Sequence, residues 1–456
     1  MPSLQALPYP FDFRGRRAVV MGLGAFGGGM GAAKWLAQQG ARVLVTDTAL
    51  AEKLAGPMAK LAGLPIEYRL GEHREADFTQ ADLVVVNPAV AWMTSPFVQA
   101  AIAAGVPLTT EINLLIQRLT CPVIGITGSV GKSTTTALIH AALTAGLAHQ
   151  PGRKVWLGGN IGRSLLDDLP QIAPDHIAVL ELSSFMLEMI AWLRWSPQVA
   201  VVTNLVPNHL DRHGTMADYA AAKQFILRYQ RTEDVALLNG DDAKVATWGH
   251  FTPAQKQFWR VTGETFPMEM PGQHNQSNAR AALAVLTTVP GVDRDAAALA
   301  ISTYPGLPHR LQRVHTQILN GRKVGFYNDS KATTCESSLT AVAAFAPQTA
   351  IFIVGGFDKK IDLSPFSRAL AQHAAAVLTI GATGPELAAQ IRAANPKAVV
   401  HEAENLPNAC AQLPTLLQQL PQAVEVVLSP ACASWGQFAN YEKRGELFTQ
   451  LVQAIT

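Results

Sequence analysis

Short apolar runs without polar alternation recur along the chain, and most are followed by an amphipathic stretch. Near the beginning these runs are RAVVMG (Arg17–Gly22), RVLVTD (Arg42–Asp47) and DLVVVN (Asp82–Asn87). Strands that are apolar at every position are buried on both faces, as in a parallel sheet covered by helices. Residues Gly28–Gln39, after the first run, are typical of a helix. The pattern predicts a small doubly wound α/β domain.

The same strand and helix pattern continues through the rest of the 456 residues. Further predicted strands are Pro122–Thr127, Ala178–Leu182, Val199–Thr203, Asp234–Asn239, Lys323–Asn328, Ala350–Gly355, Ala376–Gly381 and Glu425–Ser429. One helix is predicted from Lys132 and another around Asn278–Val289. A single hydrophobic core rarely grows beyond roughly 250–300 residues. We therefore expect three α/β domains, at residues 1–109, 110–306 and 307–456.

The composition excludes several classes of protein. The formal net charge of +2 lacks the basic excess that is typical of nucleic-acid-binding proteins. No apolar run reaches the roughly 18 residues that span a bilayer, and Met1–Phe13 lacks the features of a signal peptide. The four cysteines have no metal-type spacing, and Cys432 is interpreted as a small buried residue. We expect a cytoplasmic protein with reduced thiols and with no nucleic-acid or membrane partner.

The most specific local motif is GITGSVGKST (Gly125–Thr134), between an apolar strand and a helix. Its small residues let backbone N–H groups surround a phosphate chain. Lys132 can reach the β- and γ-phosphates, and the Ser133 hydroxyl can bind Mg²⁺. Ile126 replaces the first glycine of the usual pattern. The strand, loop and helix context nevertheless favours ATP binding over a purely structural turn.

Glycines also mark the first predicted strand–helix turn, in Gly22-Leu-Gly24-Ala-Phe-Gly27, and Asp47 closes the second strand. This spacing by itself is typical of dinucleotide binding, with Asp47 on a ribose hydroxyl. It also fits a tight turn that needs glycine for structural reasons. Because the chain already carries a phosphate loop, the sequence favours a nucleotide substrate here over a redox cofactor.

Polar residues follow several predicted strands at their carboxyl ends, where open parallel sheets bind ligands. Glu181 ends one strand and can hold Mg²⁺, which prefers oxygen ligands. His209 follows another strand, and its residue type alone favours a hydrogen-bonding loop residue over a metal ligand. The third domain has polar clusters at three strand ends: Asn328–Thr333, Gly355–Lys359 and Ser429–Ser434. Together these clusters predict a site for an anionic or zwitterionic ligand.

Ten motifs in a fixed order resemble the glutamate-adding branch of the Mur ligase family. They are GITGSVGKST, GGNIG, ELSSF, TNLVPNHLDRHG, YAAAK, GQHNQSNA, GLPHR, NDSKAT, GGFDK and SPACASW. The resemblance implies a Rossmann-like N-terminal UDP-binding domain, a central P-loop ATPase-type domain and a Rossmann-like C-terminal domain for the incoming amino acid. The residues that it implies for the UDP substrate are Leu23, Gly24, Ala25, Asp47, Thr48, Asn87, Ala89 and Asn160.

The resemblance also assigns residues to ATP, metal and glutamate. The implied ATP contacts are Gly128, Ser129, Gly131, Lys132, Ser133, Thr134, Asn275, Arg310 and Asp329. The implied glutamate contacts are Lys331, Thr333, Lys359, Ser434 and Tyr441. The implied Mg²⁺ ligands are Ser133, Glu181, His209 and Lys223, the last as a carbamate formed with CO₂. Lys132, Glu181, His209 and Lys223 are the implied catalytic residues, although the residue type of Lys223 alone is typical of a helix surface.

The implied enzyme is a ligase that uses ATP, through an acyl phosphate and with two Mg²⁺ ions, to add D-glutamate to UDP-N-acetylmuramoyl-L-alanine for peptidoglycan. Its partners would be small molecules, and we expect a monomer. Four alternatives stay open. They are the same reaction with L-glutamate, a folylpolyglutamate-type ligase, a non-catalytic nucleotide-binding protein of this fold, and a nicotinamide dehydrogenase.

Overall fold

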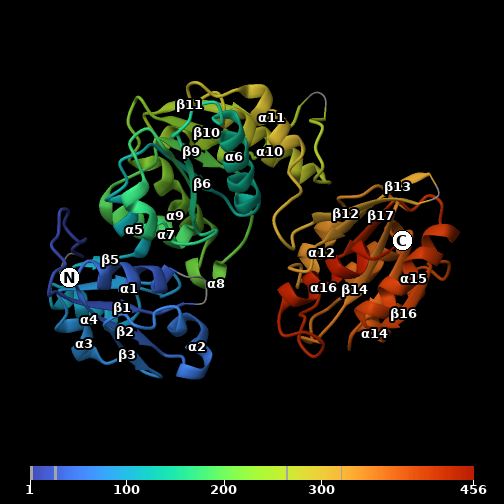
Figure 1. Cartoon of the computed structure of the whole chain (residues 1–456), viewed down its shortest axis with the longest axis horizontal. Coiled ribbons are helices and arrows are strands. Elements are labelled where there is room, and N and C mark those ends of the chain that lie inside the picture. Colours follow the sequence, from blue (N-terminus) through green and yellow to red (C-terminus); the bar gives the residue numbers. More distant parts are fainter. Residues whose placement is uncertain (1–3, 25–27, 263–264, 320, 456) are drawn as a thin grey trace. The chain divides into compact units, whose positions relative to one another are not determined.

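The computed structural model describes residues 4–24, 28–262, 265–319 and 321–455, and it divides into two compact units. The first unit consists of Met1–Gly263 and Asn278–Ala300, and the second of Glu264–Ser277 and Ile301–Thr456. The first unit contains two sheets and the second unit contains one, each with helices packed against it (Figure 1). The predicted α/β class is confirmed.

The first sheet has the strand order β3-β2-β1-β4-β5, and every pairing is parallel. Its strands are β1 (Arg17–Met21), β2 (Arg42–Asp47), β3 (Ile66–Leu70), β4 (Leu83–Val86) and β5 (Leu108–Thr109). The helices that follow are α1 (Gly28–Gln38), α2 (Ala51–Ala59), α3 (Glu75–Thr79) and α4 (Pro96–Ala103). The predictions of β1, β2 and β4 are confirmed. Strand β3 was not predicted, because this edge strand is only half-buried and contains charged residues.

The second sheet has the order β11-β10-β9-β6-β8-β7, again entirely parallel. Its strands are β6 (Val123–Thr127), β7 (Val155–Gly159), β8 (Ile177–Glu181), β9 (Val199–Val202), β10 (Val235–Asn239) and β11 (Gln255–Trp259). Its helices are α5 (Glu111–Ile116), α6 (Lys132–Gly146), α7 (Ser184–Ile190), α8 (Leu210–His213), α9 (Met216–Arg228), α10 (Gln273–Val285) and α11 (Arg294–Ser302). Short 3₁₀ helices are η1 (Leu166–Gln171), η2 (Ala191–Leu193) and η3 (Val245–Phe251). The predicted start of α10 at Asn278 was wrong, because its first turn is polar and shows no apolar periodicity.

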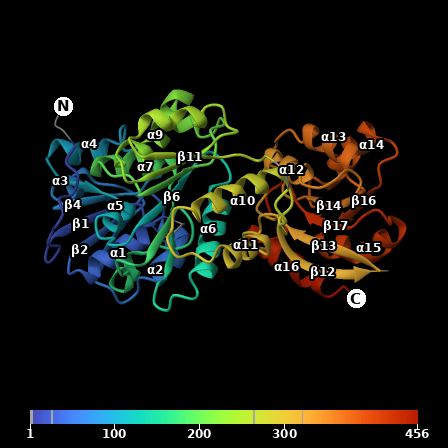
Figure 2. The same cartoon turned by 90° about the horizontal axis from the view of Figure 1, so that it is seen from above.

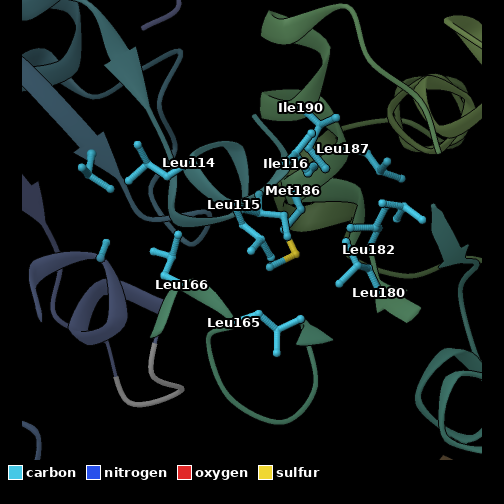
Figure 3. Packing of buried hydrophobic residues seen from close by; sticks show 14 of the residues in the cluster. Leu114, Leu115, Ile116, Leu165, Leu166, Leu180, Leu182, Met186, Leu187 and Ile190 are labelled. Atoms are coloured by element: carbon cyan, nitrogen blue, oxygen red, sulfur yellow. The ribbon is translucent and has the colours of Figure 1, made fainter. Parts of the chain in front are cut away.

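The two sheets of the first unit share one hydrophobic core. Figure 3 shows leucine, isoleucine and methionine side chains of α5, β8 and α7 packed together with Leu165 and Leu166. The same cluster includes Val20 of β1 and Leu36 of α1. The first two predicted domains are therefore joined by buried apolar contacts. Burial of apolar surface is the main stabilising term in folding.

The sheet of the second unit has the order β12-β13-β17-β14-β15-β16. Its strands are β12 (Gln312–Leu319), β13 (Arg322–Asn328), β14 (Ala350–Gly355), β15 (Ala376–Ile380), β16 (Val400–Glu404) and β17 (Glu425–Leu428). Its helices are α12 (Cys335–Val342), α13 (Ser364–His373), α14 (Gly384–Ala394), α15 (Leu406–Gln419) and α16 (Tyr441–Gln453). Only the edge pair β12–β13 is antiparallel, and the two strands run side by side in Figure 2. Strand β12 was not predicted because polar residues interrupt its apolar ones.

Two simpler predictions concern cysteine and the membrane. All four cysteines are buried and free, and burial raises the pKa of the Cys432 thiol. The interpretation of Cys432 as a small buried residue is therefore confirmed. In the part of the chain that the structure describes, no helix has the length and apolar character required to cross a bilayer.

Candidate active site

The predicted phosphate loop joins the end of β6 to the start of α6. Gly128 and Gly131 have φ values of 148° and 80°, which glycine adopts without a steric penalty. A Cβ atom on Gly131 would lie 2.5 Å from Asn278 Oδ1, so this close approach also requires glycine. Lys132 begins α6, and its Nζ donates to the carbonyl oxygens of Gly128 (3.0 Å) and Ser129 (2.8 Å). Two carbonyl oxygens of the loop therefore bind the ammonium group of Lys132.

Asn204, two residues after the end of β9, forms two hydrogen bonds with the backbone of Val130 in the phosphate loop. Its Oδ1 accepts a hydrogen bond from the Val130 N–H at 3.0 Å, and its Nδ2 donates to the Val130 carbonyl at 3.0 Å. Thr203 Oγ1 donates to the same carbonyl at 2.8 Å. Asn204 was not predicted from the sequence, although its place directly after a predicted apolar strand was an available signal.

Lys223 lies on α9 and is only 1% exposed. Its Nζ donates to the Gly128 carbonyl at 2.7 Å and lies 4.5 Å from the centre of the Tyr219 ring. Burial, followed by repulsion from Lys132, lowers the pKa of Lys223 to about 6, against the attraction of Glu181. The interpretation of Lys223 as a surface lysine is therefore wrong, because α9 turns this side chain toward the phosphate loop.

Glu181 ends β8, opposite Ile126 of β6, and it is 1% exposed. Asn160 Nδ2 donates to Glu181 Oε1 at 2.8 Å. The other carboxylate oxygen, Oε2, is buried and has no hydrogen-bond partner among the described residues. A buried carboxylate oxygen without a partner is costly, and a bound cation would remove that cost. This hard oxygen suits Mg²⁺.

His209 is the N-cap residue of α8 and has a left-handed φ of 52°. Its ring lies edge-on to Phe185, with 5.2 Å between the ring centres. Burial lowers the pKa of His209, and Lys132 and Lys223 lower it further, against Asp211. A lower pKa favours the neutral ring, which is the form that can donate a lone pair to a metal.

Lys223 interacts electrostatically with both Glu181 and His209, so these three side chains lie within range of one another's charge. Ser133 is half-buried in the first turn of α6. Within the described ranges, no group of three His, Cys, Asp or Glu side chains forms a conventional metal cluster. A site here would therefore depend on less usual donors, such as a hydroxyl or a modified lysine.

Asp47, at the end of β2, orders the glycine turn of the first sheet. Its Oδ2 accepts the Leu23 N–H and its Oδ1 accepts the Ala49 N–H, both at 2.9 Å. Asn87, after β4, closes the same turn, since a Cβ on Gly24 would lie 3.0 Å from its Nδ2. The carboxyl ends of β1, β2 and β4 thus meet, as predicted for a ligand-binding edge. Of the other residues expected here, Thr48 and Ala89 are exposed, and Ala25 lies outside the described residues.

In the second unit, Asp329 follows β13 and is buried. Leu311 N–H donates to its Oδ1 at 3.1 Å, and the Ser429 hydroxyl donates to its Oδ2 at 2.8 Å. Burial raises the pKa of Asp329 to about 7, although these two hydrogen bonds and Arg310 oppose the shift. The bond to Ser429 joins two of the polar clusters that the sequence placed at strand ends.

Two lysines of this unit lie over aromatic rings. Lys331 Nζ is 5.3 Å from the centre of the Tyr441 ring, and Lys359 Nζ is 5.7 Å from that of Trp435. Lys359 Nζ also approaches the Thr333 carbonyl at 3.5 Å. Both lysines are exposed, so their ammonium groups are accessible to an anionic ligand.

Arg444, on α16, is a buried cation that the sequence analysis missed. It is 1% exposed and donates to the Ser330 hydroxyl (3.0 Å), the Ser330 carbonyl (2.9 Å) and the Cys432 carbonyl (3.1 Å). Burial lowers its pKa to about 10. The remaining predicted residues of this unit are Asn275 and Ser434, which are buried, and Arg310, which is exposed.

Family models match two segments of the chain. Residues 16–110 match the "Mur ligase MurD-like, N-terminal domain", and residues 126–262 match the "Mur ligase middle domain". A UDP-N-acetylmuramoylalanine--D-glutamate ligase of Roseiflexus sp. (strain RS-1) is 35% identical, over 97% of this chain and 99% of that protein. The protein of the same name from Anaeromyxobacter dehalogenans (strain 2CP-C) is 36% identical, over 96% of this chain and 98% of its own.

Solved structures share the fold at lower identity. The UDP-N-acetylmuramate-alanine ligase of Thermotoga maritima superposes with a TM-score of 0.57 at 19% identity, over 96% of this chain and 99% of that one. The MurF ligase of Thermotoga maritima in complex with ADP gives a TM-score of 0.53 at 16% identity, over 99% and 98%. At these identities the structures support the fold.

Proposed function

The chain belongs to the Mur ligase family, among its UDP-N-acetylmuramoylalanine--D-glutamate ligases, and we propose that it joins D-glutamate to UDP-N-acetylmuramoyl-L-alanine with ATP. The product is a precursor of peptidoglycan. One observation in the structure carries the proposal: Lys132 and the buried Lys223 both donate to the Gly128 carbonyl of the phosphate loop. Both side chains therefore lie at the phosphate loop, where Lys132 supplies a cation to a reaction in which anions must approach each other.

The reaction has two steps. The alanine carboxylate attacks the γ-phosphorus of ATP, the bond to the β–γ bridging oxygen breaks, and ADP leaves from a new acyl phosphate. The glutamate amine then attacks the acyl carbon, loses a proton and expels inorganic phosphate as the amide forms. The protein contributes alignment and charge stabilisation more than covalent chemistry. Lys132, at the start of α6, would stabilise the negative charge of the transferring phosphoryl group.

The residues around the loop fit bound Mg²⁺. The Oε2 of Glu181 is buried and has no hydrogen-bond partner among the described residues, and the lowered pKa of His209 favours the ring form that binds a metal. We propose that Ser133, Glu181, His209 and a modified Lys223 hold two ions. When bound, Mg²⁺ would neutralise phosphate charge.

The proposed modification of Lys223 is a carbamate formed with CO₂. Carbamate formation needs a neutral amine, and burial already lowers the pKa of Lys223 to about 6. The product is an anion with two oxygens, at a place where the Lys223 amine contacts the Gly128 carbonyl and the Tyr219 ring. The modification would therefore replace a buried amine by an oxygen ligand for a hard metal ion.

We propose that residues 1–109 bind the UDP substrate, residues 110–306 bind ATP, and residues 307–456 bind glutamate. The proposed UDP-substrate residues are Leu23, Gly24, Ala25, Asp47, Thr48, Asn87, Ala89 and Asn160. The proposed ATP residues are the phosphate loop with Asn275, Arg310 and Asp329. The proposed glutamate residues are Lys331, Thr333, Lys359, Ser434 and Tyr441. We also propose that the protein is cytoplasmic, since ATP and nucleotide-linked sugars are cytoplasmic metabolites. We further propose that it is a monomer.

A product assay tests the function. The protein is incubated with ATP, Mg²⁺, UDP-N-acetylmuramoyl-L-alanine and either enantiomer of glutamate, and ADP, phosphate and the UDP product are measured. We expect stoichiometric ADP and product with D-glutamate only. Product with L-glutamate would support the first alternative, and activity with a folate in place of the UDP substrate would support the second. Tight ATP binding without any product would support a non-catalytic protein.

A further inference from the structure

Arg212 joins the segment that carries His209, a predicted metal ligand, to the loop that follows β4 in the first sheet. Arg212 lies in the one-turn helix α8, and its Nη1 donates to the Ala89 carbonyl at 2.9 Å. Its Nη2 donates to the next carbonyl, that of Val90. Charged donors make the stronger protein hydrogen bonds, and the planar guanidinium can serve two neighbouring acceptors at once. The Ala89–Val90 loop is thus attached to α8.

The same loop contacts the second sheet at another point. The Trp92 ring packs edge-on against Trp192, which lies in η2 after α7, with 5.3 Å between the ring centres. Both rings pack against the hydrophobic cluster that includes Val84 of β4 and Met189 of α7. The loop is therefore held on both sides, by a charged contact and by an apolar one.

Arg212 also packs against the same aromatic side chain as His209, the ring of Phe185. Its guanidinium carbon lies 5.0 Å from the centre of the Phe185 ring. His213 stacks on Phe185 at 5.1 Å, and His209 meets Phe185 edge-on at 5.2 Å. His213 Nε2 is hydrogen bonded to the Ser184 hydroxyl at 2.9 Å. Helix α8 is fastened to α7 through these contacts.

The backbone of His209 explains why α8 needs such anchors. A left-handed φ, here 52°, is unfavourable for residues other than glycine, and it persists only where the surroundings hold it. The N–H groups of Arg212 and His213 both donate to the His209 carbonyl, at 3.1 and 3.0 Å. A shift of the Arg212 side chain would therefore act on the turn that sets the direction of the His209 ring.

We propose that Arg212 is a positioning residue that couples occupancy of the Asn87–Val90 loop by the UDP substrate to the placement of His209 at the ATP and metal site. This inference rests on the proposed function, which supplies the ligands of the two sites. Two sites that share one bistable element change each other's affinity by the same factor. Binding of the UDP substrate then tightens binding of Mg²⁺ and nucleotide, and the reverse.

The test measures this coupling directly. The dissociation constant of UDP-N-acetylmuramoyl-L-alanine is determined by calorimetry with and without Mg²⁺ and a non-hydrolysable ATP analogue. The full chain is used as wild type, Arg212→Ala, Arg212→Lys and Arg228→Ala. Arg228 is the matched control, since it is an exposed arginine on α9 whose guanidinium carbon likewise lies over a ring, 4.9 Å from the centre of the Phe225 ring. The kcat and the KM for each substrate are measured in parallel.

For the wild type and Arg228→Ala we expect the analogue to tighten UDP-substrate binding by about tenfold, within the usual range of coupling. For Arg212→Ala we expect a ratio near one, a higher KM for the UDP substrate and a lower kcat. Arg212→Lys keeps the positive charge but loses the planar guanidinium that donates to two carbonyls at once. We therefore expect a ratio of the two dissociation constants between those of the wild type and Arg212→Ala.

Several results would overturn the inference. One is a wild-type ratio of one, and another is an unchanged ratio in Arg212→Ala. If Arg212 only stabilised the loop, Arg212→Ala would weaken UDP-substrate binding by the same factor with and without the analogue. That result would also count against coupling. These outcomes leave wild-type turnover intact, whereas failure of the proposed function shows as a wild type without product.

Discussion

The Lys223 Nζ lies 2.7 Å from the carbonyl oxygen of Gly128, so a helix lysine and the phosphate loop are in direct hydrogen-bonding contact. The two residues are far apart in sequence, and Lys223 is almost completely buried. Any change of charge or length at Lys223 therefore acts at the place where the loop would hold a phosphate chain.

Lys223→Ala should be nearly inactive if the carbamate supplies oxygens to the metal site. A short carboxylic acid should partly restore activity, because it brings back the missing carboxylate-like group. Depletion of CO₂ should lower the activity of the wild type, and Lys223→Arg should stay inactive since arginine forms no such carbamate. Steady-state ADP release measures all of these effects.

The control for Lys223 is Lys256→Ala, which removes an exposed lysine of β11. It should behave as wild type, with and without added acid. Full activity of Lys223→Ala in the absence of acid would remove the carbamate from the mechanism.

Lys132→Ala should lower the rate of ADP release by on the order of 10²–10³, as is usual for loss of one group that stabilises developing charge. The fold should persist, because Lys132 is not part of a hydrophobic cluster. Circular dichroism checks the fold, and Lys154→Ala is the control, since Lys154 is an exposed lysine that faces the Trp156 ring. Near-normal turnover of a folded Lys132→Ala protein would contradict the assigned role.

The first sheet should bind UDP compounds and not NAD. One carboxylate oxygen of Asp47 accepts the Leu23 N–H of the glycine turn and the other accepts the Ala49 N–H after β2, so its first task is to order these backbone segments rather than to hold a ribose. Calorimetry with UDP-N-acetylmuramoyl-L-alanine, UDP and NAD decides the question. Tight binding of NAD without binding of the UDP substrate would favour the dehydrogenase alternative.

Stability should depend on pH through Glu111, whose carboxyl is hydrogen bonded to the Ser164 hydroxyl in the first unit. Burial raises the pKa of Glu111 to about 7. The folded state then binds the proton more tightly than the unfolded state. The resulting stabilisation is complete below the ordinary glutamate pKa of about 4.3 and is lost as the pH rises to about 7.

Glu111→Gln keeps a hydrogen-bonding side chain but does not titrate. At pH 8 it should therefore be more stable than the wild type by on the order of 3–4 kcal/mol, and at pH 5 by only about 1 kcal/mol. Chemical denaturation at the two pH values measures this, with Glu52→Gln as the exposed control. The same difference at both pH values would show that Glu111 does not titrate in this way.

The sequence alone determined the fold class and the family. Uninterrupted apolar strands are typical of a covered parallel sheet, so the central strands were predictable from their residues. The GITGSVGKST loop was predictable for the same kind of local reason, since its glycines, lysine and strand–helix context all lie within one short segment. Local pattern was less informative for the half-polar edge strands β3 and β12, whose side chains are partly exposed.

Only the tertiary structure decided which polar side chains are buried and what they contact. The sequence near Lys223 and that near Arg444 both are typical of an exposed helix face, yet packing buries each residue against loops from distant segments. Asn204 and Arg212 likewise acquire their roles from contacts with Val130 and with the Ala89–Val90 loop. The pKa and the position of a side chain depend on burial and on charges brought near by folding, and neither is encoded within a short segment of sequence.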